Sequence, residues 1–495
     1  MKKKFSKLFT SLCLILVAAL LIQPATASAE EDLFYTYTYD YWGIERESPD
    51  AYAMNKVITT NTFGIGNLNS AEGMFVKDNQ LFICDTLNNR IIQLSYENDN
   101  YSLVKVVTEL NNNGKMEPIS LPYDIFVTDD NEWYIADYGN ERIVYTDDSQ
   151  NVIGAIYKPE DEETIEADFK FKPKKLVVDA AKRIFVQAEN VNKGFMEFEY
   201  DGEFVGYIGA ADVQFDFIDY FYKLISTKEQ REQMEAFVPT EYSNISLDAD
   251  GFIYATLSTF EDENAASAKP VRRLNAKGTD ILIRNGYYEP VGDVQYGSGG
   301  GYEGPSKFID VAVLDNECYY CLDMTRGRIF GYDFQGNMLY AFGGIGYRQG
   351  NFKFPVAIEN LGDSLLVLDK ELGTITQMTL TTYGKLINDA LNTYKKGEYD
   401  ISADYWEQVL KLNGNYDLAY IGIGRSLLRK DQFVEAMEYF KLKFDYKNYS
   451  KAYKLYRKEW VEDNITYVFI ILVVLLVVVF IKNTVKKIRR EVSEE

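Results

Sequence analysis

A short strand-and-turn pattern that recurs six times is the feature that most restricts the fold of this chain. Each copy has an apolar strand, an acidic turn, a second apolar strand that ends near an Asp, a polar turn and a third strand. The clearest copies cover residues 82–91, 134–143 and 320–329. In the six copies, the Asp or its equivalent is residue 85, 137, 188, 257, 323 or 369, which gives spacings of 46 to 69 residues.

Repeats of this kind and length are typical of a β-propeller, in which each blade has four short strands. Residues 53–59 precede the first full copy and have the pattern of an outer strand, while the last copy ends after Met378. We expect this N-terminal strand to complete the sixth blade, because the pairing removes an exposed sheet edge. The two widest spacings contain a predicted amphipathic helix at 215–238 and a glycine-rich loop at 297–302. The predicted fold class is mainly β, with a six-bladed propeller over residues 53–381.

The turn after the second strand carries the motif apolar-Asp-x-x-Asn-x-Arg-Ile. This motif resembles the NHL repeat, and the resemblance covers about residues 53–380. Ala188 and Leu257 replace the Asp in the third and fourth blades. Because the Asp and Arg recur around the ring, we expect them to fix the turn as an ion pair rather than to form a ligand site. The residues of this structural motif are Asp85, Arg90, Asp137, Arg142, Asp323 and Arg328.

Residues 383–462 change to a helical period and contain two aligned units of 34 residues. This pattern resembles tetratricopeptide repeats, in which small residues let paired helices approach and aromatic residues fill the space between them. Because two repeats rarely stand alone, we expect a helix at 450–462 to cap them. The aligned pairs are Ala390 with Gly424, Ser402 with Ala436, and Trp406 with Phe440.

The sequence patterns at both ends of the chain predict an association with a membrane. Residues 1–29 have a basic start, an apolar run and small residues at the end, which are the features of a signal peptide. Residues 465–481 are apolar and uncharged, and five basic residues follow in the tail, 482–495. A run of this length spans a bilayer as a helix, and the basic cluster favours a cytoplasmic tail. We therefore expect a single-pass protein of the cell membrane with its N-terminal domain outside the cell.

The segment 30–52, at the start of the mature chain, is rich in tyrosine. Tyr35, Tyr37, Tyr39 and Tyr41 alternate along it, so their side chains share one face of an extended strand. Such amphipathic rings suit a carbohydrate or peptide surface, and they equally suit packing against the propeller. We favour packing, because a bare extended strand of tyrosines would be prone to aggregation.

Charge and composition exclude several classes of function. Without the predicted signal peptide and tail, 72 acidic and 43 basic residues remain, a net charge of −29 that argues against a nucleic-acid partner. The chain has no His, which excludes Ser-His-Asp and Cys-His catalysis and a His-ligated zinc. The mature chain keeps only Cys84, Cys318 and Cys321, so we do not expect disulfides to hold the fold.

Alignment of the blades predicts a site in the central channel, at equivalent positions just before each innermost strand. Four of the six positions are polar, which a purely structural layer does not need. Oxygen atoms of Asp124, Asn244 and Asp310 suit Ca²⁺ or Mg²⁺. The propeller resemblance points to the same region, since six-bladed relatives such as gluconolactonases hold a divalent metal there. Alternatively, these side chains bind channel waters and neighbouring strands. The aligned residues are Gly73, Asp124, Lys175, Asn244, Asp310 and Ala357.

Two functions of different classes follow from these observations. The first is an anchored, non-enzymatic binding or scaffold protein that uses the propeller and helical repeats for a protein partner, or for a carbohydrate or peptide ligand, in connection with an envelope or sugar-transport system. The second is a divalent-metal-dependent hydrolase of the lactonase kind that uses Asp124, Asn244 and Asp310. We favour the first, because the chain lacks His and combines two interaction modules with an anchor. No cofactor is firmly implied beyond the Ca²⁺ or Mg²⁺ of the second.

Overall fold

The computed structural model describes residues 36–159, 165, 168–210, 241–260, 265, 268–294 and 304–494. Four sequence predictions lie outside these residues, namely the signal peptide, the place of Tyr35, the helix at 215–238 and the loop at 297–302. The chain divides into two compact units. The first unit is Asp50–Thr381 with the chain up to Tyr37, and the second is Thr38–Pro49 with Thr382–Glu495.

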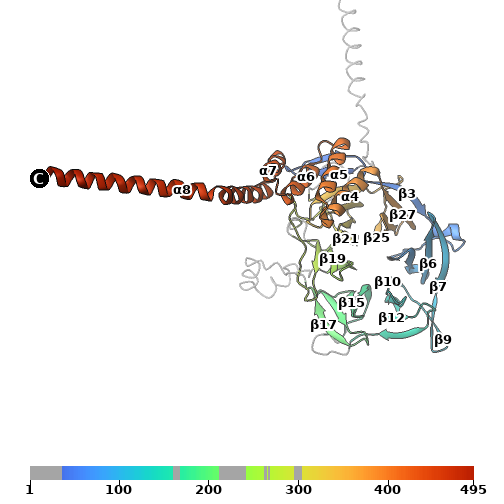
Figure 1. Cartoon of the computed structure of the whole chain (residues 1–495). Helices are drawn as coiled ribbons and strands as arrows, with labels where there is room; N and C mark the ends of the chain where they lie inside the picture. The colour runs from blue at the N-terminus through green and yellow to red at the C-terminus, as the bar shows by residue number, and fades with distance from the viewer. Residues whose placement is uncertain are drawn as a thin grey trace, which may run out of the picture. The chain divides into compact units, whose positions relative to one another are not determined.

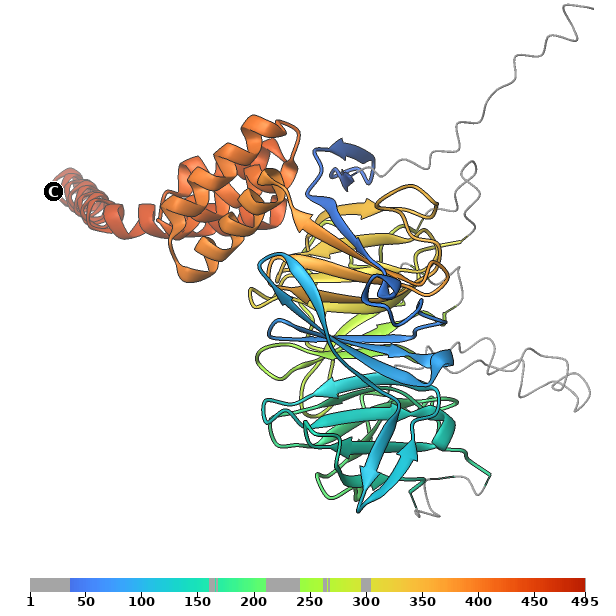
Figure 2. The same ribbon diagram turned by 90° about the vertical axis from the view of Figure 1, so that its right-hand side faces the viewer.

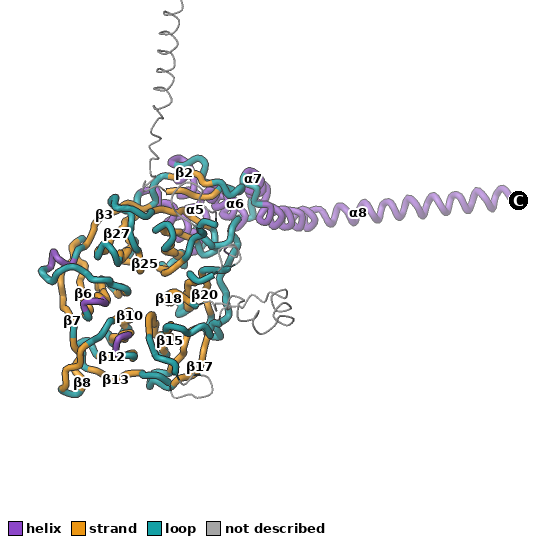
Figure 3. Tube along the Cα trace, turned by 180° about the vertical axis from the view of Figure 1, so that it is seen from behind, coloured by secondary structure: helices purple, strands orange, loops and turns teal. Residues whose placement is uncertain are grey.

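The first unit is a six-bladed β-propeller, which confirms the predicted fold class (Figure 1). Inner strands of successive blades contact one another and the last contacts the first, so the ring closes. Figure 3 shows the ring from behind, with the strands in orange.

Blade one has β4 (Gly73–Lys77), β5 (Gln80–Asp85), β6 (Arg90–Glu97) and β7 (Asn100–Val107); blade two has β10 (Pro122–Val127), β11 (Trp133–Asp137), β12 (Arg142–Thr146) and β13 (Val152–Ile156). Blade three has β14 (Pro173–Val178), β15 (Ile184–Ala188), β16 (Phe195–Phe198) and β17 (Phe204–Ile208); the described part of blade four has β18 (Tyr242–Leu247), β19 (Ile253–Leu257) and β20 (Val271–Leu274). Blade five has β21 (Phe308–Val313), β22 (Tyr319–Asp323), β23 (Arg328–Tyr332) and β24 (Met338–Gly343); blade six has β25 (Pro355–Leu361), β26 (Ser364–Asp369), β27 (Thr374–Leu380) and β3 (Tyr52–Ile58).

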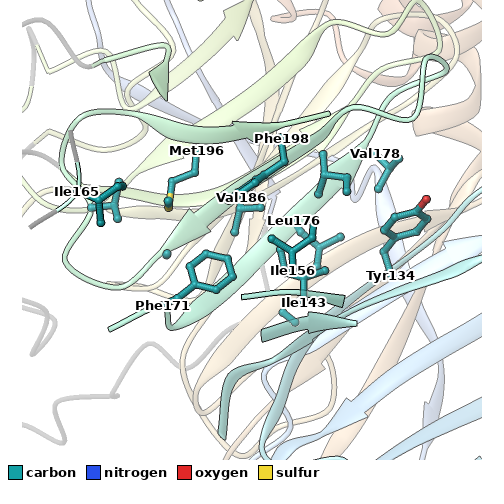
Figure 4. Packing of buried hydrophobic residues seen from close by; sticks show 14 residues of the cluster. Tyr134, Ile143, Ile156, Ile165, Phe171, Leu176, Val178, Val186, Met196 and Phe198 are labelled. Atoms are coloured by element: carbon teal, nitrogen blue, oxygen red, sulfur yellow. The ribbon is translucent and has the colours of Figure 1, made fainter. Parts of the chain in front are cut away.

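The core consists of apolar layers between neighbouring blades. Figure 4 shows one such layer, in which Tyr134, Ile143 and Ile156 of blade two pack against Leu176 and Val186 of blade three. The second strand of a blade is buried along its whole length in blades two to five. Because that strand has neighbours on both faces, its sequence is continuously apolar rather than alternating. This explains why the second strands gave the clearest repeat in the sequence.

The N-terminal strand β3 is the outer strand of blade six. It pairs antiparallel with β27, with Ile58 opposite Ile375 and Tyr52 opposite Leu380. Its burial alternates along most of its length, as expected for a strand with one face exposed to solvent. The first and last parts of the propeller are therefore joined by main-chain hydrogen bonds, and β27 is not left as an edge.

The described part of the tyrosine-rich segment begins with a short strand. β1 (Thr36–Tyr39) pairs with β24 of blade five at Tyr37, whose buried hydroxyl lies 2.8 Å from Asp293 Oδ1. Tyr41 belongs to the second unit, where its ring lies 5.3 Å from that of Phe444. Tyr37 and Tyr41 thus pack against the protein itself, although the neighbouring Trp42 remains 67% exposed.

The Asp and Arg of the turn motif meet in blades one and two. Arg90 Nε lies 2.6 Å from Asp85 Oδ2, and Arg142 Nε lies 2.8 Å from Asp137 Oδ2. Short 3-10 helices, η2 (Thr86–Asn88) and η3 (Tyr138–Asn140), follow these aspartates. The other carboxylate oxygens accept hydrogen bonds from the backbone N–H of Asn69 and Ser120, which lie in the segments that enter each blade.

In blade five, the expected ion pair between Asp323 and Arg328 does not form. Asp323 accepts hydrogen bonds from the N–H of Lys307 and Thr325, whereas Arg328 forms an ion pair with Asp293 and donates to Tyr37 Oη at 2.8 Å. Asp293 lies in the long connection before blade five. The spacing of five residues predicted that Arg328 pairs with the Asp of its own turn, but Arg328 forms its ion pair with Asp293, which lies outside the repeat.

The second unit consists of β2 (Glu45–Ser48) and five helices, four of which pack side by side in sequence (Figure 2). Neighbouring helices approach each other closely because small residues lie between them. A Cβ at Gly422 would lie 2.2 Å from Trp406 Nε1, and one at Gly424 would lie 2.8 Å from the Phe440 ring. The turns between paired helices repeat after 34 residues, since Gly397 and Asp431 both have positive φ. The helices are α4 (Thr382–Lys396), α5 (Tyr399–Leu412), α6 (Asp417–Arg429), α7 (Phe433–Leu442) and α8 (Tyr446–Glu494).

Helix α8 corrects the predicted boundary between a capping helix and a membrane helix. The helix runs unbroken from Tyr446 to Glu494, so the predicted segments 450–462 and 465–481 are parts of one element. By length and composition, it is long and apolar enough to cross a membrane, and its most apolar window has no buried residues. The absence of a Gly or Pro between the two segments explains the continuity.

Candidate functional site

The aligned polar residues of four blades lie within the inner strands rather than before them. Asp124 is opposite Ala136, Lys175 opposite Gln187, Asn244 opposite Thr256 and Asp310 opposite Leu322. In each case a shift in strand register comes just before the polar residue. A bulge re-aims the side chain at that point, and here the four side chains line the central cavity. The sequence alignment therefore identified equivalent positions, but placed them slightly too early.

The two aspartates connect neighbouring blades. Asp124 Oδ2 accepts a hydrogen bond of 3.0 Å from the N–H of Leu176 in the next blade. Asp310 Oδ2 accepts one of 2.7 Å from the N–H of Ile358, and Asn244 Nδ2 donates to Asp310 Oδ1. Each side chain thus replaces a main-chain bond that inner strands of separate blades do not make. The interpretation that these residues bind neighbouring strands has direct structural support.

Lys175 lies among the carboxylates. Its Nζ is 3.7 Å from Asp124 Oδ1 and donates a hydrogen bond of 3.3 Å to the carbonyl oxygen of Glu72. Burial lowers the pKa of Lys175, but the negative charges of Asp124 and Asp310 outweigh this effect and hold the pKa above its ordinary value. Burial raises the pKa of Asp124, and it raises that of Asp310 to about 6, in both cases against the influence of Lys175. Lys175 therefore remains charged and supplies the local positive charge.

Glu359 is a site residue that the sequence alignment missed. It lies on β25, two residues after the aligned Ala357, and lines the same cavity. Among the described residues, no hydrogen bond or ion pair is found for its carboxyl group. Burial, and then the negative charges of Asp310 and Asp124, raises the pKa of Glu359 well above its usual range. Alternation along a strand puts residues 357 and 359 on one face, so the signal was present in the sequence.

The cavity has a volume of about 240 Å³ and is lined by both polar and apolar residues. The rings of Phe75 and Phe126, 4.8 Å apart, form part of the apolar wall. Gly73 permits the close contact of blades one and two at this level, because a Cβ there would lie 2.3 Å from the carbonyl oxygen of Tyr123. The polar lining residues are Asp124, Lys175, Asn244, Ser246, Asp310, Glu359 and Asn360.

The predicted metal ligands do not form an obvious cation site. Among the described residues, no group of three or more His, Cys, Asp or Glu side chains is placed to share a metal ion. Asp124 and Asp310 already accept backbone hydrogen bonds, and Asn244 directs its Nδ2 donor at Asp310. The ammonium group of Lys175 repels a divalent cation. The three ligands Asp124, Asn244 and Asp310 therefore fit Ca²⁺ or Mg²⁺ poorly.

The unpaired carboxyl of Glu359 predicts a stability that depends on pH. An unfolded Glu titrates near pH 4.3, and the folded pKa is higher, so this group stabilises the fold at low pH and loses that effect as pH rises through the folded pKa. Glu359→Gln should raise stability at pH 8 by about 1–3 kcal/mol, because it removes a charge that Asp310 and Asp124 repel, and each unit of pKa shift corresponds to about 1.4 kcal/mol. The gain should disappear near pH 4, where Glu359 is protonated in both states. Asp124, Lys175 and Asp310 face Glu359 and remain in both proteins.

Urea denaturation of both proteins at several pH values between 4 and 8 would measure this difference. The control is Glu97→Gln, an exposed residue at the turn between β6 and β7, which should change stability little at any pH. A gain for Glu359→Gln that stays constant from pH 4 to pH 8 would contradict the assignment.

Comparisons with known proteins find only distant similarity. No protein-family model matches the chain, and no curated protein matches it. Among solved structures, virginiamycin B lyase from Staphylococcus aureus is 12% identical, with a TM-score of 0.38, and covers 67% of this chain and 100% of its own. A streptogramin B lyase is 11% identical, with a TM-score of 0.39 and the same coverages. Regucalcin from Agrobacterium tumefaciens, described as a calcium-binding protein, is 11% identical, with a TM-score of 0.36, and covers 64% of this chain and 91% of its own. At these values the similarity says nothing about ligand or activity.

Proposed function

We propose that the protein is a single-pass, membrane-anchored binding protein whose propeller channel takes a small ligand. The observation that carries this proposal is the cavity of about 240 Å³ into which Glu359 brings a carboxyl group without a partner among the described residues. Asp124, Asn244 and Asp310 are committed to hydrogen bonds between blades, whereas the carboxyl group of Glu359 has no such role. A polar group that lines a cavity and serves no packing role is typical of a binding site.

Binding is better supported than catalysis for this cavity. Lys175 is held by Asp124 and by the carbonyl of Glu72, so it is not a free nucleophile or base. The chain has no His to act as a general base. A metal-dependent hydrolase of the lactonase kind has less support, because a divalent ion would lie beside the Lys175 ammonium group. We also propose that the helical unit binds a protein partner and that the protein acts together with an envelope or transport system. Nucleic acid is not a proposed partner.

Helix α8 supports the anchor, and the basic residues after its apolar segment favour a propeller and helical unit outside the cell. A protease added to intact cells should digest the propeller and leave a tag fused after Glu495 protected. Truncation after Asp463 removes the apolar segment and should move the protein from the membrane fraction to the soluble fraction. A protected propeller with a digested tag would contradict the orientation, and a truncated chain that stays in the membrane would contradict the anchor.

The ligand site is tested with a panel of small compounds on the full chain in detergent. The panel contains alkylammonium salts, short carboxylates, alcohols, monosaccharides, dipeptides, Ca²⁺ and Mg²⁺, and binding is measured by calorimetry. The matched variant is Ser246→Trp, which fills the cavity from β18. Binding of an organic compound that this variant abolishes supports the proposal. Binding of none of them, or binding that survives the filled cavity, overturns it. A calcium effect that Asp310→Asn removes would instead favour the hydrolase.

A further inference from the structure

The charges around the cavity do not balance within the protein. Three carboxyl groups, from Asp124, Asp310 and Glu359, face one ammonium group, from Lys175. The single cation is nearest to Asp124, at 3.7 Å, and Asp310 is satisfied by two backbone N–H groups and Asn244. Glu359 is the carboxyl group that has no hydrogen bond or ion pair among the described residues, and a bound cation would stabilise its ionised form.

The apolar lining of the cavity suits the apolar part of an organic cation. Phe75 of β4 and Phe126 of β10 contribute a ring pair there, and Leu247 and Val313 add aliphatic surface. Aromatic rings attract ammonium and guanidinium groups that are removed from water. The volume of about 240 Å³ lies below the range of about 300–1,000 Å³ that drug-sized ligands occupy. The ligand is therefore small and combines one charged end with an apolar end.

We propose that the propeller channel binds a small alkylammonium or guanidinium compound, whose cationic group pairs with the Glu359 carboxylate and whose apolar part lies against Phe75 and Phe126. This inference rests on the proposed function, since it names the ligand class of the same cavity. A metal dication does not fit, because no group of three acidic side chains converges on one point within the described residues. A single organic cation needs only one carboxylate, and the ammonium group of Lys175 lies beside Asp124.

The test compares three probes of equal length on the full chain in detergent: butylammonium chloride, 1-butanol and sodium butyrate. Butylammonium should bind at least tenfold more tightly than either of the others. Glu359→Gln keeps the shape and hydrogen-bonding capacity of the side chain but removes its charge, and it should weaken butylammonium binding at least tenfold while leaving 1-butanol unchanged. Glu97→Gln, which removes an equivalent charge from the exposed turn between β6 and β7, should have no effect.

Three results would overturn the inference. The first is equal affinity for butylammonium and 1-butanol, and the second is normal butylammonium binding by Glu359→Gln. The third is butylammonium binding that survives Ser246→Trp, because the cation would then lie elsewhere on the acidic surface. If a sugar or dipeptide binds in a manner that Ser246→Trp abolishes and Glu359→Gln does not affect, the proposed function stands and only the ammonium assignment fails.

Discussion

Replacing Asp85 with alanine is expected to lower the free energy of unfolding of the propeller by about 3–5 kcal/mol, the usual cost of leaving one member of a buried ion pair alone. Asp85 is fully buried and accepts hydrogen bonds from Asn69 N, Asn88 Nδ2 and Arg90 Nε at 2.7, 2.8 and 2.6 Å. Its removal leaves the guanidinium group of Arg90 without its carboxylate and two further donors without an acceptor. Asp85→Asn keeps an acceptor and should fall between the wild type and Asp85→Ala.

The matched control for this experiment is Asp148→Ala. Asp148 also pairs with a basic residue, Lys105, at 3.2 Å, but its side chain is 68% exposed. An exposed ion pair contributes about 0–1 kcal/mol, so this variant should unfold at almost the same urea concentration as the wild type. Equal losses for Asp85→Ala and Asp148→Ala would show that the turn motif has no special structural role.

The second large effect is expected at the closure of the ring. Tyr52 on β3 is fully buried, and its ring lies 5.0 Å from Phe342 and 5.6 Å from Tyr320 in blade five. Tyr52→Ala should cost about 3–5 kcal/mol, as for other large aromatic side chains removed from a core. The loss should appear as a lower midpoint in urea denaturation and as faster digestion of the N-terminal strand.

Tyr52→Phe separates ring packing from hydrogen bonding at this position. The hydroxyl of Tyr52 is buried and has no hydrogen-bond partner among the described residues. Removal of an unsatisfied polar group is neutral or favourable, so Tyr52→Phe should be at least as stable as the wild type. A loss in Tyr52→Phe as large as that in Tyr52→Ala would mean that the hydroxyl, and not the ring, holds the closing strand.

The propeller was predictable because each blade repeats one local pattern. The second strand is buried on both faces and ends at Asp85, Asp137 and Asp323 in the three clearest copies, so strand, turn and spacing all indicated the same unit. The closing strand could be anticipated for a related reason, since an incomplete last copy implied a missing strand. Local repetition carries this kind of information because every copy meets the same neighbours.

The features that could not be predicted from the sequence depend on contacts between segments that are far apart in the chain. The partner of Arg328 is Asp293, which precedes it by 35 residues and belongs to no repeat. The bulges that turn Asp124 and Asp310 into the channel shift the strand register by a single residue, which alignment of apolar positions does not detect. Glu359 was missed for a simpler reason: the alignment compared one position per blade and did not follow the same face two residues further along β25.

In the proposed anchored protein, the unbroken helix α8 would also set a height above the membrane. At about 1.5 Å per residue, the 19 residues from Tyr446 to Asn464 form a rod of about 28 Å between the α7–α8 corner and the start of the apolar segment. A helix of this kind resists bending, so in the proposed anchored protein its length and tilt would set how far α7 lies from the lipid headgroups. A partner that contacts helices α4 to α7 must itself project that far from the bilayer or be a soluble component of the surrounding envelope.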